Sequence, residues 1–517
     1  MVKKLRPGIL VTGAFLSASI TLLVFSAARD NQFVALDDFA YIVNNTNIET
    51  FGWNTVIWSL SSFYEGNWHP LTMLSLALDR SLWGLNPSGY HLTNIAIHSC
   101  TVFCSCFLFY QVLKAAQSFW QVSGSGSCPA NALTGCSTGV SDHAIALGSI
   151  AGALFFGLHP LRVESVVWAS ERKDVLCIFF VTTSLWMYVR YAIKRTRVSD
   201  APFWSSWEFR FALVLAALAQ MSKPTAVSLP LILCIADWYP LARVTDKASF
   251  QRSLAEKIPF IILSAAGVVL TLSAQQIAMN YAPDVDMVSR LLVACKALLY
   301  YIAVTIWPTG LTAFYMHPGN VASSALAEYF LYAVLVLSIS VSVMLAGRKY
   351  RMWPAFWLFY VVTLVPMLGL IQVGGQWAAD RYSYLPSLGI SLLWGGWVAC
   401  LSDRVRRGGR PVAAWCCMVF AVCQLLLYTV LTVRQIPVWR TTETLATRII
   451  EKAPHMSGAP YLARAIYRNE TGRYEQALED VGEAMKISLR RGLRRTYSEI
   501  AYQQAVILKN LIASPRR

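Results

Sequence analysis

Two adjacent carboxylates, Asp37 and Asp38, stand a few residues after the first long apolar segment, in the sequence FVALDDFAYIVNN. A carboxylate placed beside a reacting hydroxyl can accept its proton and so act as a general base. The chain is 56% hydrophobic and only 14% charged, which makes two neighbouring acids an unusual use of charge. A helix that begins at Phe39 would need only one acid as its cap. The pair is therefore the first candidate for a catalytic group, with a structural cap as the alternative.

Four further stretches combine charged and aromatic residues. The segment NWHPLTMLSLALDRSLWG (67–84) has the apolar spacing of a helix that lies in a membrane interface. In HPLRVESVVWASERKD (159–174), Glu164 and Arg172 share one side if the segment is helical from Leu161. The other two stretches are MSKPTA (221–226), which contains Lys223, and GGQWAADRYSYLPS (374–387), which contains Asp380 and Arg381.

Acids and bases that gather on one face of a membrane domain indicate a site for a charged lipid headgroup. Arginine and lysine side chains bind phosphate through charge-assisted hydrogen bonds, and a nearby carboxylate can deprotonate an attacking hydroxyl. No cysteine and histidine spacing typical of a metal site is present, so the sequence assigns no metal ligand. The secondary candidates for this site are His69, His159, Asp174, Asp380 and Tyr382. Both histidines precede a proline, and a structural role for them is equally open.

Composition limits the class of protein. The chain has 517 residues, a net charge of +16 and 18 tryptophans, and its mean hydropathy is +0.47. Soluble domains carry about 25% charged residues, so these values predict a polytopic membrane protein. The positive charge then marks cytoplasmic loops and anionic lipid headgroups, and it does not indicate a nucleic-acid partner.

Apolar segments of spanning length recur through the first 434 residues. A helix needs about 20 apolar residues to cross a bilayer, and the first segment is read as a retained helix. With a cytoplasmic N-terminus, eleven crossings place every basic cluster from Lys3 to Arg410 in the cytoplasm. The predicted segments are 8–28, 91–113, 143–159, 174–193, 208–222, 224–241, 258–279, 325–346, 353–371, 385–401 and 411–433.

One more segment, residues 291–307, is apolar enough to cross. It carries Lys296, and a lysine at the centre of a bilayer costs roughly 2.5–3.5 kcal/mol. Counting it as a crossing would also move the last two basic clusters outside. We therefore expect a re-entrant or interfacial helix on the outer side. Residues 29–90, 160–173, 280–324, 372–384 and everything after 434 then lie on the extracytoplasmic face.

The chain becomes polar after residue 434. Between 461 and 484, Tyr461, Ala465, Gly472, Ala477 and Ala484 fall at the spacing of a tetratricopeptide repeat. The sequence thus predicts two domains: an all-α transmembrane domain over 1–434, with its first external loop at 29–90, and a short repeat-like helical domain over 435–517.

Taken together, these motifs resemble one family. The diacid, then NWHPL, HLTNIAIH, GLHPLRVESVVWASERKDVL, SKPTAVSLPLIL and ADRYSYLPSLG occur in order along nearly the whole chain. This pattern resembles the transmembrane and tetratricopeptide-repeat-containing O-mannosyltransferases and their bacterial relatives, which are C-type (GT-C) membrane glycosyltransferases. The chain departs from the usual family pattern at Pro224, where an acid is expected, and at Asp380, where glutamate is more usual.

The resemblance implies an inverting transfer of mannose or another hexose from a polyprenyl-phosphate donor to a hydroxyl, such as a protein serine or threonine. It implies Asp38 as the catalytic base, with Asp37 as the second candidate, and Glu164 as the acid that orients a substrate. Arg172, Lys223 and Arg381 would bind the donor phosphate. Some C-type enzymes use a divalent metal and others do not, so a metal stays open and no other cofactor is implied.

Other functions remain open from the sequence. One alternative is transfer to a glycolipid or surface polysaccharide, and another is a non-catalytic scaffold whose repeat domain binds a partner. The membrane is the bilayer of a bacterial inner membrane, with a periplasmic C-terminal domain, or the endoplasmic reticulum in a eukaryote. A transporter would need ionisable groups at mid-membrane, where this chain has few.

Overall fold

The computed structural model describes residues 7–122, 139–198, 202–279, 285–371, 375–408, 411–455, 457–490 and 494–513. Lys3, at the start of the predicted basic clusters, lies outside these residues. Within them the chain is almost entirely helical, with one short antiparallel pair of strands, β1 (Tyr315–Met316) and β2 (Gln376–Ala378). The prediction of an all-α fold is confirmed.

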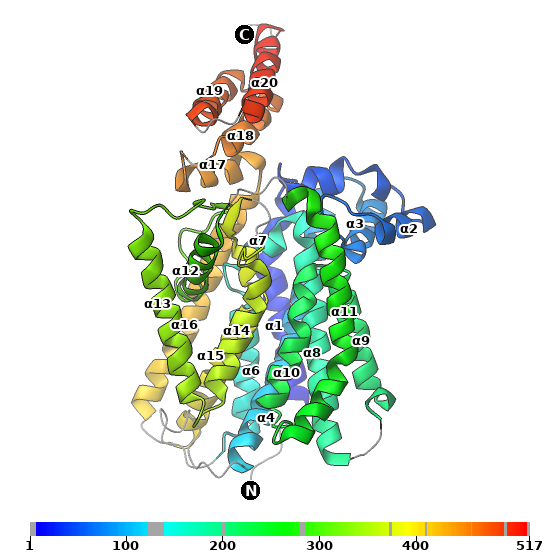
Figure 1. The fold of residues 1–517 in the computed structure, drawn as a ribbon, viewed down its shortest axis with the longest axis vertical. Coiled ribbons are helices and arrows are strands. Elements are labelled where there is room, and N and C mark those ends of the chain that lie inside the picture. The colour runs from blue at the N-terminus through cyan, green and yellow to red at the C-terminus, as the bar shows by residue number, and fades with distance from the viewer. Residues whose placement is uncertain are drawn as a thin grey trace.

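A bundle of long helices forms the body of the molecule (Figure 1). Each of the eleven segments predicted to cross a membrane is helical, because a backbone in lipid must satisfy its own hydrogen bonds. These helices are α1 (Pro7–Phe25), α4 (Pro87–Val122), α6 (Asp142–Gly157), α8 (Arg172–Val198), α9 (Trp207–Gln220), α10 (Leu229–Trp238), α11 (Lys247–Met279), α13 (Leu326–Ala346), α14 (Met352–Leu364), α15 (Ser387–Arg406) and α16 (Pro411–Gln435).

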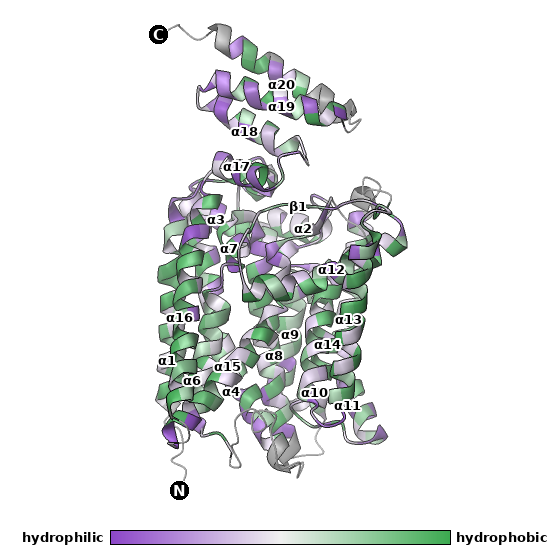
Figure 2. Ribbon diagram, turned by 90° about the vertical axis from the view of Figure 1, so that its left-hand side faces the viewer, coloured by the Kyte–Doolittle hydropathy of each residue, from purple (hydrophilic) through white to green (hydrophobic). Residues whose placement is uncertain are grey.

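Length and composition make this a multi-pass membrane protein. Within the described ranges, seven helices are long and apolar enough to cross a membrane, and three shorter apolar helices accompany them. Apolar residues cover the bundle, whereas polar residues concentrate at its ends and in the C-terminal helices (Figure 2). Helices α6 and α15 pack closely, since a side chain at Gly148 would overlap the backbone oxygen of Gly395.

The helix α12 (Met287–Ile306) contains the segment predicted to be re-entrant or interfacial. It meets the length and composition of a spanning helix, yet it lies across the end of the bundle that carries the C-terminal helices (Figure 2). Its contacts agree with this position, since Lys296 lies near Tyr329 in the first turn of α13. The carbonyl of Thr305, near its other end, accepts a hydrogen bond from His159 just after α6. The expectation of a non-crossing helix agrees with this arrangement.

The loop between α1 and α4 and the connections near α12 cover this same end of the bundle. Two helices, α2 (Trp53–Ser61) and α3 (Pro70–Trp83), project to one side of it (Figure 1). Short helical turns complete the region: η1 (Ser26–Asp30), η2 (Phe39–Val43), η3 (Thr46–Ile48), α7 (Arg162–Val167), η4 (Ala169–Glu171), η6 (Pro224–Ser228), η7 (Val365–Met367) and η8 (Asp380–Ser383). The turn η5 (Phe203–Ser205) precedes α9.

The chain after α16 forms η9 (Ile436–Trp439), α17 (Thr442–Lys452), α18 (Ala459–Glu470), α19 (Tyr474–Arg490) and α20 (Arg494–Ala513). Helices α18 and α19 pair around Tyr461, Ala465, Ala477 and Ala484, the residues that predict a tetratricopeptide hairpin. Gly472 makes the turn between them at a φ of 76°, a backbone conformation that favours glycine. Arg464 replaces an apolar residue of the repeat pattern because it forms an ion pair with the nearly buried Asp480.

Candidate functional site

The two adjacent acids occupy different environments. Asp38 is fully buried; its carboxylate accepts hydrogen bonds from the backbone N–H of Val34 at 3.0 Å and of Ser170 at 2.8 Å. It makes no cap bond to η2, so the alternative role of a helix cap does not apply. Burial raises the pKa of Asp38 to about 6, although the two N–H donors act against this. The side chain of Asp37 is 42% exposed.

Asp37 contacts a lysine from another part of the chain. Its Oδ2 lies 2.9 Å from Nζ of Lys173, in the first turn of α8. The Lys173 ammonium also lies over the ring of Tyr41, 4.9 Å from its centroid. Asp37 is thus an accessible carboxylate held beside a cation, whereas Asp38 anchors its own loop to the Ser170 backbone.

Glu171 brings three cations together. Its buried carboxylate lies 3.3 Å from Lys173, 3.4 Å from Lys223 and 3.4 Å from Arg381. These cations come from α8, from the turn between α9 and η6, and from η8. Their side chains are 12%, 13% and 13% exposed, so each retains some contact with the surface. The site therefore holds three cations around one carboxylate, and such side chains form charge-assisted hydrogen bonds with anions.

Two more buried acids hold the outer members of this group. Glu164 accepts from the guanidinium of Arg381 and, at 3.0 Å, from its backbone N–H. Asp174 lies 2.5 Å from Nζ of Lys223. Burial raises the pKa of Glu164, while Arg381 acts in the opposite direction. Lys223 and Arg381, predicted from sequence as phosphate ligands, are thus brought into one site with Glu164 and Asp174.

Arg172 does not join this site. Its buried guanidinium donates to Asn94, to Ser75, to Asp79 and to the backbone oxygen of Tyr90. The sequence interpretation assumed one helix from Leu161 to Arg172. The structure instead has α7, then a break at Trp168 with ψ of 117°, then η4 and α8. The break turns Arg172 toward α3 and α4, so the expectation that it binds phosphate does not fit this geometry.

Of the secondary candidates discussed next, His69 and Tyr382 lie near the site, and His159 does not. His69 is buried against Tyr41, with ring centroids 5.3 Å apart, and burial lowers its pKa to about 3, so the imidazole is neutral. Tyr382 lies beside Arg381, whose guanidinium is 5.1 Å from its ring centroid. His159 has a structural role: one ring nitrogen bonds the backbone oxygen of Thr305, and the other accepts from the backbone N–H of Leu161.

Asp380 and a buried arginine support the η8 turn. Tyr315 of β1 donates to Asp380 at 2.8 Å, and Arg162 donates to Ser383 at 2.9 Å. Arg162 is fully buried and stacks on the ring of Tyr384. These contacts fix η8 and so the place of Arg381.

Four residues of the region were missed by sequence reasoning: Glu171 and Lys173, which belong to the site, and Arg162 and Asp79, which support the surrounding structure. Lys173 directly follows Arg172 in the sequence. The backbone break at Trp168 sets the direction in which each side chain points, and the sequence does not reveal that break. Asp79 is buried and pairs with Arg172. No local sequence signal reveals that partner, which is 93 residues away.

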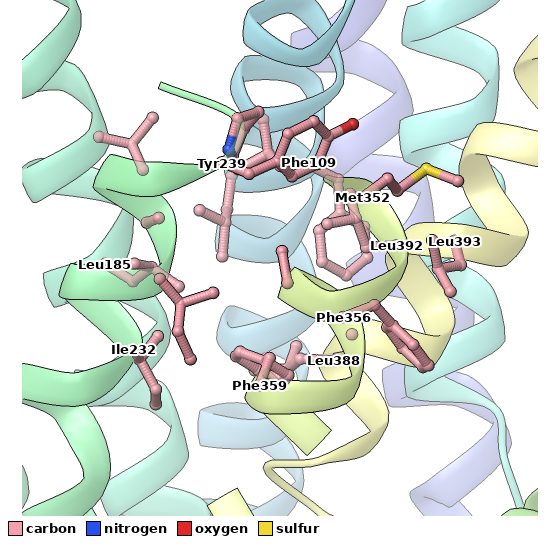
Figure 3. A pocket seen from close by; sticks show the side chains of 18 residues that line it. Phe109, Leu185, Ile232, Tyr239, Met352, Phe356, Phe359, Leu388, Leu392 and Leu393 are labelled. Atoms are coloured by element: carbon pink, nitrogen blue, oxygen red, sulfur yellow. The ribbon is translucent and has the colours of Figure 1, made fainter. Parts of the chain in front are cut away.

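An apolar cavity of about 120 Å³ lies between the bundle helices (Figure 3). Its walls come from α4, α8, α10, α14 and α15, and include Phe109, Leu185, Ile232, Phe359 and Leu388. Leu388 belongs to the first turn of α15, seven positions after Arg381 in the sequence. Among the described residues, no group of three or more histidine, cysteine or acidic side chains is arranged to hold a metal ion.

Comparison with known proteins identifies relatives. No family model matches the chain. Human protein O-mannosyl-transferase TMTC1 is 22% identical over 520 residues, which covers 92% of this chain and 55% of that protein. Mouse protein O-mannosyl-transferase TMTC4 is 26% identical over 218 residues, covering 40% of this chain and 27% of that protein. Fruit-fly Tmtc1 is 27% identical over 183 residues, covering 35% and 16%.

The chain spans about half the length of TMTC1 and about a quarter of TMTC4. Among solved structures, ArnT from Cupriavidus metallidurans bound to undecaprenyl phosphate aligns with 96% of this chain and 75% of that chain. The identity is 13% and the TM-score 0.40. The homologues of this chain are the TMTC protein O-mannosyl-transferases, and the resemblance seen in its motifs is confirmed at the level of the whole sequence.

Proposed function

We propose that this protein is a membrane glycosyltransferase that moves a hexose from a polyprenyl-phosphate donor to a hydroxyl acceptor. The observation that carries the proposal is the group formed by Asp37, Glu171 and the three cations Lys173, Lys223 and Arg381. In this group an accessible carboxylate, the proposed base, lies next to three cations, the proposed phosphate ligands. Relatives named protein O-mannosyl-transferases support mannose as the sugar and a protein serine or threonine as the acceptor.

Asp37 is the better placed of the two acids to act as the base. A base must lie within hydrogen-bond reach of the hydroxyl that it deprotonates. The exposed carboxylate of Asp37 meets this condition, whereas both oxygens of Asp38 are used by backbone N–H groups inside the protein. The role of Asp38, which the family resemblance makes the base, is then to hold the loop in place.

The reaction is a single displacement. The acceptor oxygen forms a bond to the anomeric carbon, its proton passes to the Asp37 carboxylate, and the bond from that carbon to the phosphate oxygen breaks. The phosphate leaves with the bonding electron pair, and one displacement inverts the anomeric configuration. Lys173, Lys223 and Arg381 stabilise the charge that gathers on the phosphate in a partly buried site, where such interactions are strong.

The donor lipid needs an apolar environment beside this headgroup site. The cavity between α4, α8, α10, α14 and α15 is lined by apolar side chains, among them Leu388 in the first turn of α15. It provides room inside the bundle for part of a polyprenyl chain. The end of the bundle with α17–α20 is proposed as the extracytoplasmic end, and the repeat-like helices of residues 435–517 as a separate domain that contacts the acceptor.

The test is sugar transfer in membranes that contain the wild-type chain or Asp37→Asn at equal amounts. The probes are radiolabelled polyprenyl-phosphate mannose and polyprenyl-phosphate glucose, with a mannosylatable peptide and a membrane lipid extract as alternative acceptors. Transfer by the wild type that collapses in the variant supports the proposal and identifies the acceptor class. Equal transfer by both removes Asp37 as the base. Absence of transfer from any donor by the wild type favours a scaffold.

A further inference from the structure

The C-terminal segment contacts the loop that carries Asp37. The backbone N–H of Gln32 donates to the oxygen of Arg440 at 2.9 Å. The backbone N–H of Ala35, two residues before Asp37, donates to the hydroxyl of Thr442 at 2.9 Å. Thr442 is the first residue of α17 and is itself buried. The loop is therefore bound on one side by a helix that is more than 400 residues away in sequence.

The same C-terminal segment also contacts two other parts of the site. Trp439 of η9 is buried and stacks on Trp168, with ring centroids 5.5 Å apart. The Trp168 ring also lies near the guanidinium of Arg381, at 5.4 Å, and Nζ of Lys173, at 5.7 Å. One indole ring thus connects the C-terminal segment to two of the three cations.

Further along α17, the side chain of Arg448 donates to the backbone oxygen of Leu311 at 3.1 Å. Leu311 precedes β1, whose Tyr315 bonds Asp380 next to Arg381. The segment from η9 to α17 therefore touches the loop of Asp37, the ring beneath the cations and the connection that supports η8. One segment of the chain thus contacts three separate parts of the site.

We propose that Thr442 is a positioning residue for catalysis: its hydroxyl holds the Ala35 backbone and so sets the distance between Asp37 and the acceptor hydroxyl. The inference rests on the proposed function. The C-terminal helices then serve the chemical step directly, in addition to any contact with the acceptor. A misplacement of about 1 Å at a reacting group can cost about 100-fold in rate. Loss of this hydroxyl also leaves the Ala35 N–H without its acceptor in the protein.

The experiment compares Thr442→Val, which removes the hydroxyl at nearly constant shape, with Thr442→Ser, which keeps it. Thr429→Val is the matched control, because the Thr429 hydroxyl bonds only within α16, to Leu425 at 2.8 Å, among the described contacts. For each full-length variant, kcat and the donor KM are measured with polyprenyl-phosphate mannose. Amide hydrogen exchange of the peptide covering residues 31–38 is followed in parallel.

For Thr442→Val we expect kcat to fall at least about tenfold, with the donor KM within about twofold of wild type, since the phosphate-binding cations are untouched. Thr442→Ser should restore most of kcat, and Thr429→Val should change neither constant. The peptide 31–38 should exchange faster in Thr442→Val alone.

Wild-type kcat in Thr442→Val overturns the positioning role, whatever the exchange result. Failure of Thr442→Ser to restore kcat also overturns it, because the hydroxyl would not be the feature that matters. These outcomes leave the proposed function intact. Absence of transfer by the wild type itself overturns the proposed function, and the positioning role with it.

Discussion

The Nζ atom of Lys173 lies 2.9 Å from Oδ2 of Asp37, although 136 residues separate the two in the sequence. This ion pair joins the loop after α1 to the first turn of α8. It also joins the two halves of the proposed chemistry, since Asp37 is the proposed base and Lys173 one of the proposed phosphate ligands. The ammonium holds the Asp37 carboxylate beside the proposed phosphate site.

Replacement of Asp37 by asparagine removes the base while keeping its shape. We expect transfer to fall about 10²- to 10⁴-fold, the usual contribution of a positioned general base. Folding should be unaffected, because the side chain is 42% exposed. Initial rates in membranes with equal amounts of protein measure the effect. Asp30→Asn, at an exposed acid in the same loop, is the control and should retain the full rate.

Loss of Lys173 should weaken donor binding. For Lys173→Met we expect the donor KM to rise about tenfold, which corresponds to about 1.4 kcal/mol of lost phosphate interaction. Lys173→Arg, which keeps the charge, should lie between this variant and the wild type. Lys509→Met, at an exposed lysine of α20, should leave KM unchanged. An unaltered KM in Lys173→Met would remove it from the donor site.

Arg172 should behave as a structural residue. It is fully buried and pairs with Asp79, and removal of one partner of a buried pair costs about 3–5 kcal/mol. Arg172→Met should therefore lower the melting temperature strongly, while the donor KM of the protein that remains folded stays near the wild-type value. The control is Lys486→Met, which breaks an exposed ion pair with Glu483 and should cost about 0–1 kcal/mol. A raised KM without loss of stability would return Arg172 to the phosphate site.

Asp38 should make stability depend on pH. Burial raises its pKa from 3.8 to about 6 in the folded protein, so the folded state holds a proton that the unfolded chain has lost. The stabilisation from this proton is complete below about pH 3.8 and disappears as the pH rises through about 6. As the pH rises from about 3.8 to about 6, the melting temperature of the wild type in detergent should fall more than that of Asp38→Asn. Melting temperatures of wild type and Asp38→Asn that change in parallel with pH would contradict the raised pKa of Asp38. The control variant Asp30→Asn should show the same pH dependence as the wild type.

A bulky residue in the cavity should discriminate between donors by lipid length. Ala236 lines the cavity, and Ala236→Phe would fill part of its volume. We expect KM to rise for a polyprenyl-phosphate donor of natural length and to stay constant for a donor with a two-isoprene tail. Val341→Phe adds similar bulk to the exposed surface of α13 and should affect neither. An equal effect on both donors in Ala236→Phe would show that the cavity does not hold the tail.

The sequence predicts the helices of this protein better than it predicts the orientation of individual side chains. Apolar length and basic clusters locate α1, α4 and the other bundle helices, since lipid imposes the same requirement on each. The amphipathic pattern before Trp83 likewise predicts α3, whereas the short helix α2 carries no comparable signal. The C-terminal hairpin follows from small residues such as Ala465 and Ala477 at repeat spacing.

The site is harder to predict because it depends on local backbone breaks and distant partners. The break at Trp168 decides that Lys173 faces Asp37 and that Arg172 faces Asp79. Likewise, the difference between Asp37 and Asp38 arises from the Ser170 N–H, which is 132 residues away. Lys223, Glu164 and Arg381 can be found from the sequence because each lies in an unusual polar stretch. Glu171, the common partner of Lys173, Lys223 and Arg381, emerges only when three segments are brought together.

The position of α12 determines on which side of the bilayer later residues lie. This helix lies across the end of the bundle (Figure 2). The connection from Trp307 to Ala325 therefore stays at the end of the bundle where α11 finishes, and α13 starts from that same end. Every helix from α13 onward therefore runs opposite to the direction that a count of all apolar helices would give. The chain ends consequently lie at opposite ends of the bundle (Figure 1), and a topology reporter fused after α16 would give the reverse signal from one fused before α1.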